Sequence, residues 1–134
     1  MNNKVIELAI KMCEKSHAPF SNYKVGSSVE TSTGEIVGGC NIESSSYGLT
    51  CCAERVAIFK AISEGYREFK SIAVATKNAG MPCGACRQVM VEYERNQQSD
   101  ITIFLKGEVG EIYELKSIGD LLPLAFKTDA LKRH

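Results

Sequence analysis

The sequence has no excess of charge of either sign, no long apolar run and only two histidines. Its 134 residues include 16 basic and 16 acidic side chains, so the formal net charge is zero. This balance argues against a nucleic acid polymer as the main ligand, because neutralising phosphates requires a basic surface. No stretch approaches the roughly 18 uncharged apolar residues of a membrane-spanning helix. We therefore expect neither a polynucleotide nor a membrane as a partner.

The N-terminal segment also lacks the apolar core of a secretory signal. Charged residues, among them Glu7 and Lys11, interrupt its apolar positions. Six cysteines could form three disulfides in a secreted protein. Without a signal, however, we expect a cytoplasmic protein, and in that compartment a C-x-x-C pair more often serves metal or redox chemistry. His17 and His134 are expected to be solvated, so they offer no second metal site.

The length suits one domain, residues 1–134, and the chain shows no internal repeat or linker. Helices are predicted over residues 3–16, over residues 52–64 and in a segment that begins at Pro82. Strands are predicted over residues 24–31, 35–40, 71–76, 101–105 and 111–115. Residues 120–130 are expected to be helical in part. This order predicts an α/β fold in which helices cover the faces of a mixed sheet. The second helix is apolar on nearly all sides, so we expect it to be buried on most of them.

Two short segments carry the clearest chemistry, Cys52-Ala53-Glu54 and Pro82-Cys83-Gly84-Ala85-Cys86. They offer three thiolates and one carboxylate. Three protein ligands leave the fourth position of a zinc ion open, as in catalytic sites. Both segments fall at predicted helix starts, where free N–H groups and the helix dipole lower the pKa of a thiol. The sequence therefore predicts a Zn²⁺ site at the junction of two helices.

The arrangement resembles that of zinc-dependent nucleobase deaminases, which place His or Cys before a Glu and P-C-x-x-C further on. In such a site Glu54 would take a proton from water, deliver it to a ring nitrogen and assist the departure of ammonia. Three thiolates and Zn²⁺ carry a net charge of −1, which Arg55 would offset by hydrogen bonding to a thiolate. Alternatively, Arg55 pairs with a surface carboxylate.

The remaining cysteines have simpler interpretations, with one exception. Cys13 and Cys40 are expected in the core. Cys51 is open to two further interpretations: it replaces Cys52 as a ligand, or it is a fourth ligand that closes the site. The C-A-E register favours Cys52, and adjacent residues rarely both reach one metal ion.

Nearly the whole chain resembles the small, homotetrameric cytidine deaminases. The resemblance is carried by five ordered segments: Ala18-Pro19-Phe20-Ser21-Asn22-Tyr23-Lys24-Val25-Gly26, Gly39-Cys40-Asn41-Ile42-Glu43, Tyr47-Gly48-Leu49-Thr50-Cys51-Cys52-Ala53-Glu54-Arg55, Pro82-Cys83-Gly84-Ala85-Cys86-Arg87-Gln88, and Leu121-Leu122-Pro123 leading to Phe126. Five such segments in order are far more specific than a lone C-x-x-C pair.

The resemblance implies a three-layer α/β/α sandwich around a five-stranded mixed sheet, and hydrolytic deamination of cytidine and deoxycytidine in pyrimidine salvage. A related enzyme that deaminates blasticidin S is the alternative. The resemblance implies that Cys52, Cys83 and Cys86 bind zinc, that Glu54 transfers protons, and that Glu54 and the Ala53 backbone contact the base. It also implies that Asn41 and Glu43 contact the ribose and that Tyr23 packs beside the substrate. Phe126 would stack on the base from a neighbouring subunit, Tyr47 would lie at that subunit boundary, and Arg55 and Gln88 would have supporting roles.

The ribose contacts are also plausible from the residues themselves, since side chains two apart on an extended segment point to one side. A loop-solvated pair or an Asx turn is the alternative for Asn41 and Glu43. The sequence departs from the family pattern at several positions. Tyr23 stands where Phe is usual, so the pocket gains a hydroxyl, and Met81 replaces a common Ser.

Two other functional classes fit part of the pattern. A thioredoxin-type redox pair would use Cys83 and Cys86 but would leave Cys52 and Glu54 unexplained. A structural zinc module would need a fourth ligand, for which Cys51 and Cys40 are the candidates.

Overall fold

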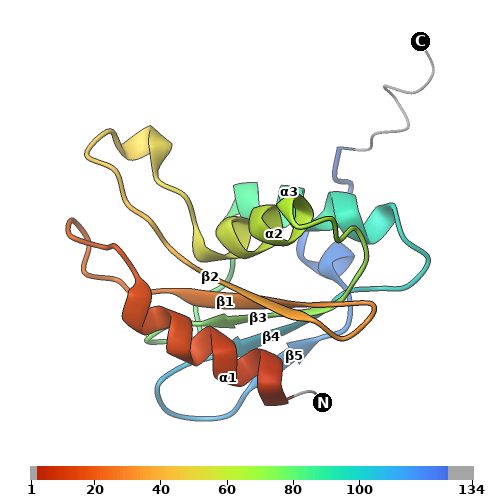
Figure 1. Ribbon diagram of the computed structural model, residues 1–134, viewed down its shortest axis with the longest axis horizontal. Helices are drawn as coiled ribbons and strands as arrows, with labels where there is room; N and C mark the ends of the chain where they lie inside the picture. The colour runs from red at the N-terminus through yellow and green to blue at the C-terminus, as the bar shows by residue number, and fades with distance from the viewer. Residues whose placement is uncertain (1–2, 127–134) are drawn as a thin grey trace.

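A five-stranded mixed sheet forms the centre of the protein in the computed structural model, which describes residues 3–126 (Figure 1). The strand order is β2-β1-β3-β4-β5. The strands are β1 (Gly26–Thr31), β2 (Ile36–Cys40), β3 (Phe69–Ala75), β4 (Thr102–Lys106) and β5 (Tyr113–Leu115). β3 and β4 pair in parallel, whereas every other neighbouring pair is antiparallel.

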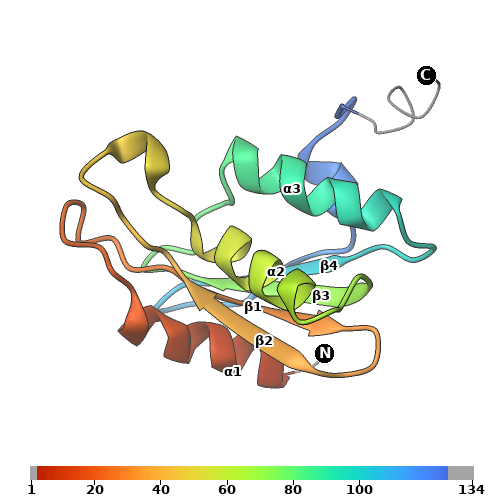
Figure 2. The same ribbon diagram turned by 45° about the horizontal axis from the view of Figure 1, so that its top comes forward.

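Helices cover both faces of this sheet. Figure 2 shows α1 (Asn3–Met12) on one face, with α2 (Ala53–Ser63) and α3 (Gly84–Arg95) side by side on the other. The side chains of β3 alternate accordingly: Ala73 packs in a cluster with Val5 of α1, whereas Ile72 packs in a cluster with Ala57 of α2 and Met90 of α3. The α/β fold with its five-stranded mixed sheet and three layers is therefore confirmed.

Helix α2 lies directly on β2, and Gly39 makes this possible. A Cβ atom at Gly39 would lie 2.5 Å from the amide nitrogen of Ala57 and 2.9 Å from the carbonyl oxygen of Ala53. No side chain fits in that space, because the atoms in the way belong to the helix backbone. Gly39 thus sets the height at which α2, together with the Cys52-Ala53-Glu54 segment at its start, sits above the sheet.

The predicted elements are present, with differences at their ends. The first predicted helix is α-helical to Met12 and continues as a 3₁₀ turn, Cys13–Lys15. The first strand begins at Gly26 rather than residue 24, because the Val25 N–H donates to Asn41 Oδ1 at 3.0 Å outside the ladder. At the C-terminal end Ile118–Leu121 is a 3₁₀ turn, and residues 127–130 of the predicted segment lie outside the described residues.

The third helix does not begin at Pro82, and that prediction was wrong. It begins at Gly84, because Cys83 takes the N-cap position with extended backbone angles and its Sγ accepts from the Cys86 N–H. Helix α2 is buried or partly buried along most of its surface, as expected, and Phe59, which is 47% exposed, is the exception among its large apolar side chains. Within residues 3–126, no helix is both long and apolar enough to span a membrane.

Candidate active site

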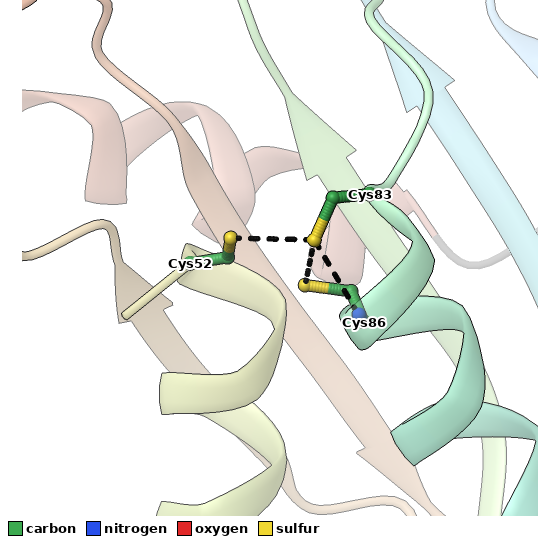
Figure 3. Close-up of side chains that lie close together, drawn as sticks. All are labelled: Cys52, Cys83 and Cys86. Carbon is green, nitrogen blue, oxygen red and sulfur yellow. Dashed lines mark hydrogen bonds between the residues drawn. The ribbon is translucent and has the colours of Figure 1, made fainter. Parts of the chain in front are cut away.

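Three cysteines from two helix starts meet at one point (Figure 3). Cys52 is the N-cap of α2, Cys83 is the N-cap of α3, and Cys86 lies in the first turn of α3. The Cys52 and Cys83 Sγ atoms are 3.6 Å apart, those of Cys83 and Cys86 are 3.4 Å apart, and all three lie within 4.8 Å of one another. The site thus joins α2 to α3 through side chains that are 31 positions apart in the sequence.

The cysteine geometry fits a zinc ion. Zinc–sulfur bonds of about 2.3 Å at tetrahedral angles place two sulfur ligands roughly 3.8 Å apart, close to the observed spacings. All three residues have free thiols. Ligation requires each of them to lose its proton, and both helix starts favour the thiolate form. Cys52, Cys83 and Cys86 are therefore positioned to bind a metal ion, which agrees with the predicted zinc cofactor.

Arg55 lies against this cluster. Its Nη2 donates to the Cys52 Sγ at 3.4 Å, as expected for a cation that offsets thiolate charge. Hydrogen bonds from Cys86, then from Arg55 and Cys83, lower the pKa of Cys52 to about 5. The pKa of Cys86 is raised, chiefly because its thiol donates to the Cys52 sulfur and because it is buried. The Nε atom of Arg55 is buried without a hydrogen-bond partner in the described part of the chain.

Cys51 stands outside the cluster. Its backbone pairs with Ile42 in both directions at 2.9 Å, which places it in a short bridge beside the helix start. Among the described residues, only Cys52, Cys83 and Cys86 form a group of three or more metal-ligating side chains. The structure thus gives no support to Cys51, or to Cys40 beside Lys15, as a fourth ligand.

A cavity of about 290 Å³ opens beside the cluster. Its walls bring together most of the residues singled out from the sequence: Tyr23, Asn41, Glu43, Cys52, Ala53, Glu54 and Cys83. Glu54 in the first turn of α2 is only 4% exposed, and this burial raises the pKa of its carboxyl. The cavity therefore places a buried carboxyl group next to the predicted metal ligands.

Asn41 and Glu43 line the same cavity as Cys52 and Cys83. The Asn41 Oδ1 accepts from the Val25 N–H at 3.0 Å and from the Ser16 hydroxyl, and its Nδ2 donates to the Tyr23 carbonyl at 2.9 Å. One amide hydrogen of Asn41 is left for a ligand. The Glu43 carboxylate accepts from the N–H of Phe20 and of Ser21, and the Ser21 hydroxyl bond is the main reason that the pKa of Glu43 is lowered.

Five of the predicted residues do not line this cavity: Cys86, which is fully buried, and Arg55, Tyr47, Phe126 and Gln88. Arg55 contacts the Cys52 sulfur instead, as described above. Tyr47 is 75% exposed and contacts the edge of the Phe20 ring at 5.8 Å. Phe126 is 60% exposed, and its carbonyl accepts from Gln88 Nε2 at 3.4 Å. Both aromatic side chains are thus available to another molecule rather than to the cavity of their own chain.

Some lining residues were not assigned from the sequence. Thr50, Thr76, Gly80 and Met81 all face the cavity. The position of Gly80 and Met81 directly before Pro82-Cys83 was a usable signal, since a loop that ends at a metal ligand must pass the metal. Thr76 gives no such signal, because only the pairing of β3 with its neighbours places its end at the cavity.

Comparison with known proteins decides the family. Residues 1–99 match the family described as "Cytidine and deoxycytidylate deaminase zinc-binding region". The chain belongs to this family. A cytidine deaminase of Sporosarcina psychrophila is 41% identical over 130 residues, which are 96% of this chain and 93% of that protein. The crystal structure of a cytidine deaminase from Burkholderia pseudomallei is 44% identical, with a TM-score of 0.87 over 94% of this chain and 99% of that one.

The chain is also similar, at lower identity, to a blasticidin-S deaminase of Bacillus cereus. It is 33% identical over 84 residues, which are 54% of this chain and 59% of that protein. The match is therefore partial, whereas the two cytidine deaminases described above match along nearly their whole length. Membership of the deaminase family and the three-cysteine cluster together make this chain a zinc-dependent deaminase.

Proposed function

We propose that the protein catalyses the hydrolytic deamination of cytidine and deoxycytidine to uridine and deoxyuridine, with release of ammonia. The observation that carries this proposal is the buried Glu54 carboxyl in a cavity whose wall includes Cys52 and Cys83. A thioredoxin-type dithiol would need neither Cys52 nor a buried acid, and a structural zinc module would need no cavity. Full-length similarity to cytidine deaminases supports the choice of substrate.

The residues of the chain have separate roles in this reaction. Bound zinc supplies activation of a water molecule at neutral pH. The Glu54 carboxylate takes up a proton from the attacking water, returns it to a ring nitrogen and then assists the departure of ammonia. Ala53, whose backbone borders the cavity, helps to orient the base. Arg55 holds the Cys52 thiolate and balances its charge.

The sugar end of the substrate is assigned to Asn41 and Glu43. The free amide hydrogen of Asn41 donates to a ribose hydroxyl, and Glu43 accepts from one. Glu43 is held in place by the N–H groups of Phe20 and Ser21, so it is oriented before the substrate arrives. These partners favour a nucleoside over free cytosine, which has no sugar hydroxyl to offer either of them. Tyr23 packs beside the substrate.

We further propose that residues 1–134 act as one catalytic domain in a cytoplasmic homotetramer that serves pyrimidine salvage. The exposure of Phe59, Tyr47 and Phe126 is consistent with an assembly in which a neighbouring subunit would cover these side chains. In the tetramer Phe126 stacks on the base in a neighbouring subunit, Tyr47 lies at the subunit boundary, and Gln88 supports the segment that carries Phe126.

The test is an ultraviolet absorbance assay of the zinc-replete protein with cytidine and deoxycytidine, run beside cytosine, CMP and blasticidin S. We expect a fall in the absorbance of the two nucleosides with release of one ammonia per turnover. Turnover of blasticidin S alone would keep the zinc chemistry and overturn the substrate assignment. No turnover by protein with bound zinc would favour a structural metal site.

A further inference from the structure

The Tyr23 hydroxyl makes a contact that the reaction does not account for. Tyr23 lies in the segment before β1, and its hydroxyl donates a hydrogen bond to Asn78 Oδ1. Asn78 belongs to the loop between β3 and α3, and the same loop supplies Gly80, Met81 and Cys83 to the cavity walls. The bond therefore links the segment beside the substrate to the loop that leads into the zinc ligands.

The local backbone is built around this contact. Asn22, next to Tyr23, has a φ of 57°, and Ala79, next to Asn78, has a φ of 54°. Residues other than glycine rarely adopt such left-handed conformations. In addition, a Cβ atom at Gly80 would lie 2.9 Å from the Tyr23 hydroxyl oxygen. Two unusual backbone conformations and one missing side chain thus converge on a single hydrogen bond.

Tyr23 also borders two cavities. A second cavity of about 650 Å³ lies next to the first, and Tyr23 and Thr76 line both of them. Lys24, Lys77 and Lys106 contribute to its walls. If the hydroxyl were released, the ring would be free to rotate, and the substrate cavity would open into this larger space. A nucleoside in the widened cavity would be held less firmly.

We propose that Asn78 is a positioning residue for the substrate, which acts by holding the Tyr23 ring where it borders the two cavities. The inference rests on the proposed function, because it requires a nucleoside in the smaller cavity. It also goes beyond that function, since the family pattern has Phe at position 23, which has no hydroxyl to hold. Neither Asn78 nor Tyr23 touches the cysteines or Glu54 through a hydrogen bond in the described residues, so the pair is expected to affect binding rather than chemistry.

The test compares Tyr23→Phe, Asn78→Ala, the double variant and Asn78→Asp in steady-state kinetics with cytidine. Loss of one hydrogen bond should raise KM about threefold to tenfold in Y23F and in N78A, with kcat and zinc content close to those of the wild type. The double variant should be no worse than either single variant, because both remove the same bond. N78D keeps an acceptor for the hydroxyl and should restore KM. Tyr113→Phe on β5, which is exposed, is the matched control.

The outcomes separate this inference from the proposed function. Unchanged KM in Y23F and N78A, with an active wild type, would overturn the role of Asn78 alone. Additive effects in the double variant would also overturn it, since the two residues would then act independently. A raised KM in N78D would overturn it as well, because this variant keeps an acceptor for the Tyr23 hydroxyl. A zinc-loaded wild type that leaves cytidine unchanged would overturn the proposed function, and this inference with it.

Discussion

At the scale of single residues, the adjacent cysteines Cys51 and Cys52 have thiol pKa values shifted in opposite directions. Burial raises the pKa of the Cys51 thiol, whereas hydrogen bonds from Cys86 and Arg55 lower the pKa of Cys52 to about 5. The difference follows from position, because Cys52 caps α2 while the backbone of Cys51 is paired with Ile42. Adjacent cysteines in one chain therefore provide a matched pair for testing the metal site.

We predict that Cys52→Ser loses zinc and that Cys51→Ser retains it. The reason is that Cys52 alone of the two lies in the three-cysteine group. Metal content of the purified proteins, measured by atomic emission, checks this prediction. Retention of zinc by C52S together with loss by C51S would show that the register of the C-A-E segment had been read one residue out of place.

A second prediction concerns Glu54. Glu54→Gln keeps the size of the side chain but removes its ability to take up and return a proton. We expect kcat for cytidine to fall by at least about a hundredfold, which is the lower range for a lost general acid–base group. Zinc content and the circular dichroism spectrum should not change. Activity close to that of the wild type would contradict the proton-transfer role.

At the scale of elements, the C-terminal part of the chain is held to α3 by a buried carboxylate. Glu94 is 8% exposed, and its two oxygens accept hydrogen bonds from four groups at 2.8–2.9 Å: the N–H groups of Ile101, Ile118 and Gly119 and the hydroxyl of Ser117. One turn of the helix away from the ligand Cys83, Arg87 donates to the carbonyls of Pro82 and Leu121. Helix α3 therefore carries the metal ligands at one end and fastens the following chain along its length.

Glu94→Ala is predicted to destabilise the fold strongly. It would leave four donors without their acceptor, and we expect the free energy of unfolding to fall by roughly 2–4 kcal/mol. Urea unfolding of the zinc-loaded protein at one fixed protein concentration measures this change. Glu92→Ala on the exposed side of the same helix is the control and should change the free energy by less than about 0.5 kcal/mol.

The same element shows which features could be predicted from the sequence. The apolar pattern and the position of Pro82 indicated a helix, and the cysteine spacing indicated its metal ligands. The role of Glu94 could not be predicted, because its partners lie up to 25 positions away and are mostly backbone groups. The partner of Tyr23 was missed for a similar reason: Asn78 stands in a loop without periodic pattern, and only the folded sheet brings the two together.

At the scale of the whole molecule, the apolar groups that stay exposed are the clearest sign of an assembly. Phe20 and Tyr47 form an exposed aromatic pair beside the cavity, and Phe126 is exposed near the C-terminal end of the described chain. The sequence resemblance implied a homotetramer, but the pattern of burial in one chain defines neither the number of subunits nor their arrangement.

We predict a mass of four times the 14.7 kDa chain in light scattering at micromolar concentration. Phe126→Ala should raise KM for cytidine, since base stacking contributes about 1–3 kcal/mol in comparable systems, and it should leave zinc content unchanged. A monomeric mass with full activity would contradict any contribution of Phe126 from a neighbouring subunit.

The close packing of Gly39 against α2 makes position 39 intolerant of substitution. Any side chain at position 39 would meet the backbone of Ala53 or Ala57 and lift the start of α2 away from the sheet. In a saturation scan scored by growth on cytidine, position 39 would therefore tolerate as little as Cys52 or Glu54, although it contributes no chemistry. Scoring the same library by protein abundance would separate the two kinds of position, because E54Q protein would accumulate and Gly39 variants would not.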